Sequence, residues 1–169
     1  MNRLYHVREI GNKKYSVGDQ LEFSGYNNFF KDYDTKDIPL VNTKKTIFQG
    51  LTYYWHFARE TIFEEVRKNI DPNLPSRQRC LWLTDIRNLD YWMHTKDFHP
   101  ETHQVLLLNL DGNAFKCDAT FVEGNPKKLN DVREDAKNYW NQEIVNEKRV
   151  EYLYEGRATV EEVLSFKNG

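Results

Sequence analysis

The chain of 169 residues has few cysteines and no long apolar run. Its two cysteines, Cys80 and Cys117, stand far apart, which excludes a disulfide framework and a zinc knuckle. The longest apolar run, Val105 to Leu108, is far shorter than the roughly 20 residues that cross a bilayer. Residues 1–6 contain no apolar stretch of signal-peptide length. We therefore expect a cytoplasmic protein that does not contact a membrane.

The sequence also lacks an excess of positive charge. Lysine and arginine number 24, and aspartate and glutamate number 26, so the formal net charge is -2. This balance disfavours a protein that coats nucleic acid in general. Aromatic residues make up 14% of the chain, a fraction too high for a disordered segment. The length suits one folded core, and we predict a single domain over residues 1–169.

Several familiar catalytic motifs are absent. The sequence contains no glycine-rich phosphate loop, no Gly-x-Gly-x-x-Gly segment, no His-Glu-x-x-His motif and no Cys-x-x-Cys pair. His99 and His103, with His94 nearby, have a spacing that could hold a metal ion on a helix. Pro100 argues against a helix there. We therefore predict solvated histidines and no metal site.

Hydrophobic periodicity predicts strands that alternate with helices. The predicted strands are Leu4–Val7, Arg79–Thr84, Gln104–Leu110, Phe115–Phe121 and Arg149–Glu155. The predicted helices are Tyr53–Asn69, a short one that Asp85 caps, and Asn130–Lys148, while Ala158–Phe166 is a strand or a short helix. Residues 11–42 are rich in turn-forming residues and are expected to be irregular. This order favours an α+β fold with a mixed, largely antiparallel sheet and flanking helices.

Short patterns add three local predictions. Asp111-Gly112 is typical of a hairpin turn between two strands. Asp131 with Glu134 three residues later is typical of a capping box. Glu60 shares a helix face with other charged residues, and we expect that face to be solvated.

Three short strand segments carry residues of chemical interest. They read Leu4-Tyr5-His6, Leu81-Trp82-Leu83-Thr84-Asp85 and Glu151-Tyr152-Leu153-Tyr154. In this order they resemble the ADP-ribosyltransferase superfamily, in the branch whose signature is His, Tyr and Glu on three separate strands. Trp82 stands where that branch usually has Tyr. Gly18-Asp19-Gln20-Leu21 also resembles a segment of rifamycin-modifying members, so the chain is similar to a small bacterial or phage-like member.

The resemblance implies an NAD-dependent transferase of the glycosyltransferase class, with its sheet split around an NAD-binding cleft. Cleavage of the bond between ribose and nicotinamide develops positive charge on the ribose, which a nearby carboxylate stabilises. Glu151 is the implied catalytic residue. An imidazole suits a ribose hydroxyl, an aromatic ring suits nicotinamide, and a guanidinium suits pyrophosphate. We therefore assign NAD contacts to His6 for the ribose, Trp82 with Tyr91 or Trp92 for the nicotinamide, and Arg77 for the pyrophosphate.

The acceptor of the ADP-ribose stays open at this point. Members of the superfamily modify proteins, nucleic acids or small antibiotics, and we expect a macromolecular acceptor, either nucleic acid or protein. A small cytoplasmic transferase fits a toxin or an antiviral defence effector. That role would imply a neutralising, antitoxin-like partner.

Three alternatives stand beside this prediction. Glu155 lies on the same strand face as Glu151 and competes with it for the catalytic position. The aromatic segments Tyr26–Tyr33 and Tyr53–His56 would suit a non-catalytic module that binds protein or single-stranded nucleic acid. A degenerate transferase fold would bind a nucleotide without cleaving it.

Overall fold

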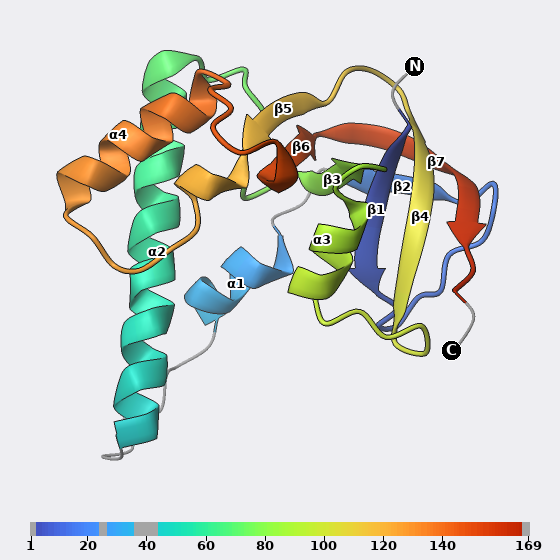
Figure 1. The fold of residues 1–169 in the computed structure, drawn as a ribbon, viewed down its shortest axis with the longest axis horizontal. Coiled ribbons are helices and arrows are strands. Elements are labelled where there is room, and N and C mark those ends of the chain that lie inside the picture. The colour runs from blue at the N-terminus through green and yellow to red at the C-terminus, as the bar shows by residue number, and fades with distance from the viewer. Residues whose placement is uncertain (1–2, 24–26, 36–43, 167–169) are drawn as a thin grey trace.

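A computed structural model describes residues 3–23, 27–35 and 44–166. It contains one seven-stranded sheet with the strand order β2-β7-β4-β1-β3-β6-β5, flanked by four helices (Figure 1). The strands are β1 (Leu4–Glu9), β2 (Gln20–Phe23), β3 (Leu81–Asp85), β4 (His103–Leu110), β5 (Phe115–Asp118), β6 (Val150–Tyr154) and β7 (Gly156–Leu164). The helices are α1 (Asn28–Thr35), α2 (Lys44–Ile70), α3 (Leu89–Thr95) and α4 (Leu129–Trp140).

All strand pairs among the described residues are antiparallel. The α+β class is therefore confirmed, and the parallel component that we allowed for in a mixed sheet is not present in this part of the chain. All five strands that the sequence predicts with alternating or apolar patterns are present, with shifted ends. Residues 158–166 fall largely within β7, which settles that segment as a strand.

The sheet is almost divided between β1 and β3. β1 pairs with β4 along its whole length, from Leu4 to Glu9. Its other edge pairs with β3 at only two positions, Leu4 with Asp85 and Tyr5 with Thr84. Beyond Tyr5 the two strands separate, so the edge of β1 from His6 onward is not paired with β3.

Two groups of helices cover different parts of the sheet. α2 and α4 lie side by side next to β5 and β6, and α3 lies beside β1 (Figure 1). Apolar side chains join α2 and α4 to the sheet: Ile62, Phe63, Val66, Cys80, Cys117, Val132, Ala136, Tyr139, Trp140 and Leu153 are buried together. Leu89 of α3 packs with Tyr5, Val7, Val105 and Leu107. Burial of these apolar surfaces is the main stabilising contribution.

The hairpin predicted at Asp111-Gly112 is wrong. The chain does turn there, but β4 and β5 are not neighbours in the sheet, because β1, β3 and β6 lie between them. β5 pairs with β6, and β4 pairs with β1 and β7. The local turn signal is real, because Gly112 has a φ of 131° that favours glycine, yet it says nothing about which strands pair.

The helix boundaries also differ from those predicted. α2 begins nine residues before Tyr53, and residues 11–42 contain β2 and α1. α4 ends at Trp140 because Gln142 has a positive φ of 62° and the buried carboxylate of Asp118 binds the amides of Val145 and Asn146 in a turn.

The two predicted helix caps are also different. The residue before α4 is Lys128, which forms no side-chain cap, so the capping box of Asp131 and Glu134 does not form. Asp85 accepts hydrogen bonds from the amides of Arg87 and Asn88 and fixes the turn before α3, whose capping position is Asn88. Asp85 therefore orders the entry to the helix without being its cap.

Within the described ranges, none of the helices could span a membrane. The longest, α2, carries charged residues at its start, Lys44 and Lys45, and from Arg59 to Lys68.

Candidate functional site

A cleft of about 1070 Å³ opens where β1 and β3 separate. Its walls come from both halves of the sheet and from α1, α2 and α3. Side chains assigned to NAD from the sequence are brought together here: His6, Arg77, Trp82, Trp92 and Glu151 all line the cleft. These residues come from parts of the chain up to 145 positions apart, so their convergence is a product of the fold.

His6 lies at the point where the two halves of the sheet part. Its Nδ1 atom is 2.9 Å from the carbonyl oxygen of Trp82. A carbonyl only accepts, so Nδ1 carries the proton and donates it, which leaves Nε2 as an acceptor when the ring is neutral. Burial, with smaller contributions from the positive charges of Lys96 and Arg8, lowers the pKa of His6 from 6.5 to about 4, although the bond to the Trp82 carbonyl acts in the opposite direction. The imidazole is therefore neutral near pH 7.

Trp82 forms an aromatic wall of the cleft together with Phe30 of α1. The two rings are stacked, with centroids 6.5 Å apart and an angle of 27° between their planes. Phe30 is fully buried, whereas Trp82 is half-buried and lines the cleft. The guanidinium of Arg77 also lies 5.9 Å from the centre of the Trp82 ring, so the orientation of this ring is fixed by its neighbours.

Glu151, the implied catalytic residue, has one of its two carboxylate oxygens fixed. Oε1 accepts hydrogen bonds from Arg77 Nη1 at 2.7 Å and from the Tyr139 hydroxyl at 2.6 Å. The other oxygen, Oε2, takes part in no hydrogen bond among the described residues. Glu151 is 5% exposed and lines the cleft. The carboxylate is thus oriented by protein donors and keeps an acceptor for a ligand.

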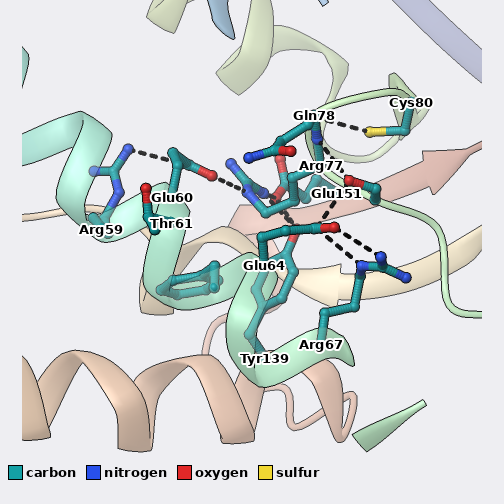
Figure 2. Close-up of polar contacts among 12 residues, drawn as sticks. Arg59, Glu60, Thr61, Glu64, Arg67, Arg77, Gln78, Cys80, Tyr139 and Glu151 are labelled. Atoms are coloured by element: carbon teal, nitrogen blue, oxygen red, sulfur yellow. Dashed lines mark hydrogen bonds and ion pairs between the residues drawn. The ribbon is translucent and has the colours of Figure 1, made fainter. Parts of the chain in front are cut away.

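Arg77 connects Glu151 to α2 through a buried chain of charges (Figure 2). Its Nε atom donates to Glu60 Oε2 at 2.9 Å, and Glu60 Oε1 accepts from Arg59 Nη2 at 2.9 Å. Arg77 Nη1 also donates to the hydroxyl of Tyr139. Charges alternate along Arg59, Glu60, Arg77 and Glu151, which offsets the cost of removing each from water.

The pKa values in this chain follow from burial and from the neighbouring charges. Burial alone would destabilise the charged form of Arg77, yet Glu60, Tyr139 and Glu151 hold its pKa well above the ordinary value. Burial would raise the pKa of Glu60, but the guanidinium groups of Arg77 and Arg59 lower it below the ordinary value. Burial raises the pKa of Tyr139 well above 10, so its hydroxyl stays protonated and can donate to Glu151. All three groups keep their ordinary charge at neutral pH.

A family model described as "Protein of unknown function (DUF2441)" matches residues 4–166. The chain belongs to the DUF2441 family. A comparison with curated proteins found no match.

Tyr91 and Trp92, the aromatic pair that follows β3 in this DUF2441 chain, make different contacts. Trp92 lines the cleft, and its Nε1 donates to the carbonyl of Val150 at 3.1 Å. Tyr91 is not among the lining residues, and its hydroxyl donates to Glu123 at 3.2 Å. Of the two alternatives for a second aromatic wall, the geometry therefore favours Trp92.

Glu155 lies outside the cleft of the DUF2441 chain. It lines a separate cavity of about 300 Å³ and accepts a hydrogen bond from the amide of Ser76 at 2.5 Å. Glu151 lies near the start of β6, whereas Glu155 follows the last residue of that strand. The geometry therefore favours Glu151 over Glu155 as the carboxylate that meets a ligand in the cleft.

The aromatic segments proposed for a binding module are only partly on the surface. Phe30 is buried against Trp82, and Trp55 packs into the core between α2 and α4. Tyr54 is 60% exposed. Tyr26 and the side chains of Phe29 and Tyr33 lie outside the described residues. The part of this surface that the structure describes therefore presents fewer aromatic rings than the sequence suggests.

Sequence reasoning missed two members of the site, Glu60 and Tyr139. Glu60 was expected on a solvated helix face but is 3% exposed and pairs with Arg77. Tyr139 was recognised only as part of the apolar stripe of α4, and its hydroxyl reaches Glu151. A buried tyrosine in such a stripe normally finds a polar partner for its hydroxyl, which was the one available signal. Across the described residues, no group of three or more His, Cys, Asp or Glu side chains could hold a metal ion.

Proposed function

We propose that this protein is a cytoplasmic NAD-dependent ADP-ribosyltransferase that transfers ADP-ribose to a macromolecular acceptor. The observation that carries the proposal is the meeting of His6, Trp82 and Glu151 in one cleft. They come from the adjacent strands β1, β3 and β6. These are the three residues and the three strands on which the resemblance to the superfamily rests.

Glu151 is suited to stabilise a ribose cation. As the bond between ribose and nicotinamide breaks, its electron pair leaves with the nicotinamide and positive charge develops on the ribose. The unbonded Oε2 of Glu151 can accept a hydrogen bond from a ribose hydroxyl, which strengthens as the charge appears. Arg77 and Tyr139 fix the other oxygen, so the carboxylate needs no reorientation during the reaction.

His6 and Trp82 are suited to hold the substrate in place. The Nε2 atom of neutral His6 can accept a hydrogen bond from a ribose hydroxyl, because Nδ1 is committed to the carbonyl of Trp82. Trp82 offers a ring face, supported by Phe30, on which nicotinamide can stack. The hydrogen bond from His6 to the backbone carbonyl of Trp82 holds the imidazole against β3, the strand that carries the ring.

We propose a role for Arg77 other than the pyrophosphate contact that its chemistry suggests. Its Nε and Nη1 donors are already used by Glu60, Tyr139 and Glu151. Two buried carboxylates already neutralise the charge of this guanidinium, which weakens its attraction for a phosphate. We therefore assign Arg77 to the positioning of Glu151.

The acceptor is a nucleic acid or a protein, and the proposed activity fits a toxin or antiviral defence effector with a neutralising partner.

The test is to incubate purified protein with NAD labelled in the adenosine part, with and without cell lysate, and to measure free nicotinamide by chromatography. We expect nicotinamide release and a labelled macromolecule that either nuclease or protease destroys. Absence of nicotinamide release both with and without lysate would contradict the proposal and favour a nucleotide-binding module.

A further inference from the structure

The cationic side chains in the cleft fall into two classes. Four arginine or lysine residues line it: Arg8, Arg59, Arg77 and Lys96. Arg59 and Arg77 form ion pairs with Glu60 or Glu151 at 2.7 to 2.9 Å. Arg8 and Lys96 form no ion pair with any carboxylate in the described part of the chain. The cleft therefore holds two cations with no carboxylate at ion-pair distance among the described residues, although the charges of Glu151 and Glu9 act on Lys96 from farther away.

Arg8 is held in one position by contacts that leave its charge uncompensated. Its Nη1 donates to the carbonyl of Lys13 at 2.8 Å, and its guanidinium lies 4.5 Å from the centre of the Tyr15 ring. Tyr15 is itself fixed, because its amide and carbonyl both bind the side chain of Gln104 at 2.9 Å. A guanidinium ordered in this way loses little further conformational entropy when it binds a ligand.

Lys96 lines the same cleft as Arg8 and His6. It follows the last turn of α3, where its amide donates to the carbonyl of Trp92 at 3.1 Å. Its ammonium and the guanidinium of Arg8 both act on His6, whose pKa they lower. Burial also lowers the pKa of Arg8 and of Lys96 below their ordinary values. Two partly desolvated cations beside one imidazole create a positive potential that a bound anion would relieve.

We propose that Arg8 and Lys96, which line the same cleft as His6, form an anion site that binds the pyrophosphate of a dinucleotide. The proposal rests on the proposed function for the identity of that dinucleotide, NAD. In a dinucleotide each ribose is bonded to a phosphate through its C5 atom. A ribose hydroxyl on His6 therefore brings phosphate oxygens toward the two cations whose charges act on this residue. Arginine and lysine are the side chains that bind phosphate oxygens most strongly.

The test uses ADP-ribose, which has the pyrophosphate but no nicotinamide bond to cleave. Its affinity is measured by calorimetry for the wild type and for Arg8→Gln and Lys96→Gln, with adenosine as the ligand that lacks phosphate. Each variant should bind ADP-ribose about 10-fold or more weakly than the wild type, because a charge-assisted hydrogen bond is lost. Each variant should bind adenosine with the same affinity as the wild type. Arg8→Lys should retain part of the affinity. Lys137→Gln, which removes an exposed cation on α4, should change nothing.

Several results would overturn the anion site. They are no measurable binding of ADP-ribose by the wild type, equal affinity in the wild type and both glutamine variants, or equal loss of adenosine binding. Weaker binding of a single-stranded oligonucleotide with unchanged ADP-ribose affinity would also overturn it, because the phosphates would then belong to an acceptor strand. Nicotinamide release is measured separately. If the variants bind ADP-ribose more weakly but the wild type releases no nicotinamide, the anion site is supported and the proposed transferase activity is contradicted. If turnover depends on Glu151 but not on Arg8 or Lys96, the transferase activity is supported and the anion site is contradicted.

Discussion

Arg77 and Glu151 lie 74 positions apart in the chain and meet in a buried ion pair, with Nη1 2.7 Å from Oε1. Arg77 precedes β3, Glu151 lies on β6, and Glu60 of α2 binds the other side of the guanidinium at 2.9 Å. The orientation of the proposed catalytic carboxylate is therefore tied to the packing of α2 against the sheet. The stability of the fold and the geometry of the cleft depend on the same three side chains.

Replacement of Arg77 by Gln should destabilise the fold strongly. It leaves the buried carboxylate of Glu151 without its cation and Glu60 with Arg59 as its one remaining partner, which costs about 3–5 kcal/mol in the free energy of unfolding. Urea unfolding followed by circular dichroism measures this loss. The matched control is Arg157→Gln, which removes an exposed ion pair with Glu22 and should cost less than about 1 kcal/mol. A similar, small loss in both variants would show that the buried chain of charges contributes little.

Tyr139→Phe should lower turnover more than it lowers substrate affinity. The variant keeps the ring in the core but removes the hydroxyl that donates to Glu151 and accepts from Arg77. We expect a stability loss of about 1–3 kcal/mol and a fall in kcat with little change in KM for NAD. Tyr154→Phe is the control, because its hydroxyl is also bonded, to the carbonyls of Asp111 and Arg157, but does not reach the cleft. Equal activity loss in both variants would reduce the role of Tyr139 to general stability.

His6 should make the stability of the protein depend on pH in a defined window. The unfolded chain binds a proton at His6 near pH 6.5, whereas burial in the folded chain lowers the pKa to about 4. The unfolded state is therefore favoured as the pH falls from about 6.5 to about 4, by on the order of 3 kcal/mol at the lower end. The difference in unfolding free energy between wild type and His6→Asn should change across this window and stay constant above pH 7. A constant difference throughout would mean that His6 titrates normally.

Trp82→Ala should weaken NAD binding and turnover together. The ring serves as a stacking wall in both the ground state and the transition state, so its removal affects KM and kcat/KM alike. Trp82→Phe keeps an aromatic face against Phe30 and should retain most of the affinity. Titration of ADP-ribose and of nicotinamide separates the contacts: nicotinamide affinity should fall and ADP-ribose affinity should change little. The opposite pattern would place Trp82 at another part of the ligand.

The fold class could be predicted from the sequence because alternation and apolar runs are local signals. They locate the five strands that carry most of the core, including those of His6, Trp82 and Glu151. The pairing of strands is not a local property, which is why the turn at Asp111-Gly112 was read as a hairpin although β4 and β5 lie apart. The end of α4 depends on amides bound by the distant Asp118, which no pattern around Trp140 reveals.

The site was predictable in part for the same reason. His6, Trp82 and Glu151 were found because they stand within short strand motifs, and the structure places all three in one cleft. Glu60 was missed because a charged residue on an amphipathic helix is normally solvated, and only its contact with Arg77 explains its burial. The unpaired state of Arg8 and Lys96 also depends on which carboxylates the fold brings near them, so residue type alone does not indicate it.

The central claim is that the Glu151 carboxylate stabilises a ribose cation, and the most direct test is the rate of nicotinamide release from NAD by Glu151→Gln. Gln keeps the size of the side chain and an oxygen for Arg77 and Tyr139, but it removes the negative charge. The rate should fall about 100-fold to 1000-fold, equivalent to roughly 3–4 kcal/mol, while ADP-ribose affinity changes by only a few-fold. Glu155→Gln, measured alongside, should release nicotinamide at the wild-type rate. Unchanged release by Glu151→Gln together with its loss in Glu155→Gln would contradict the assignment of Glu151.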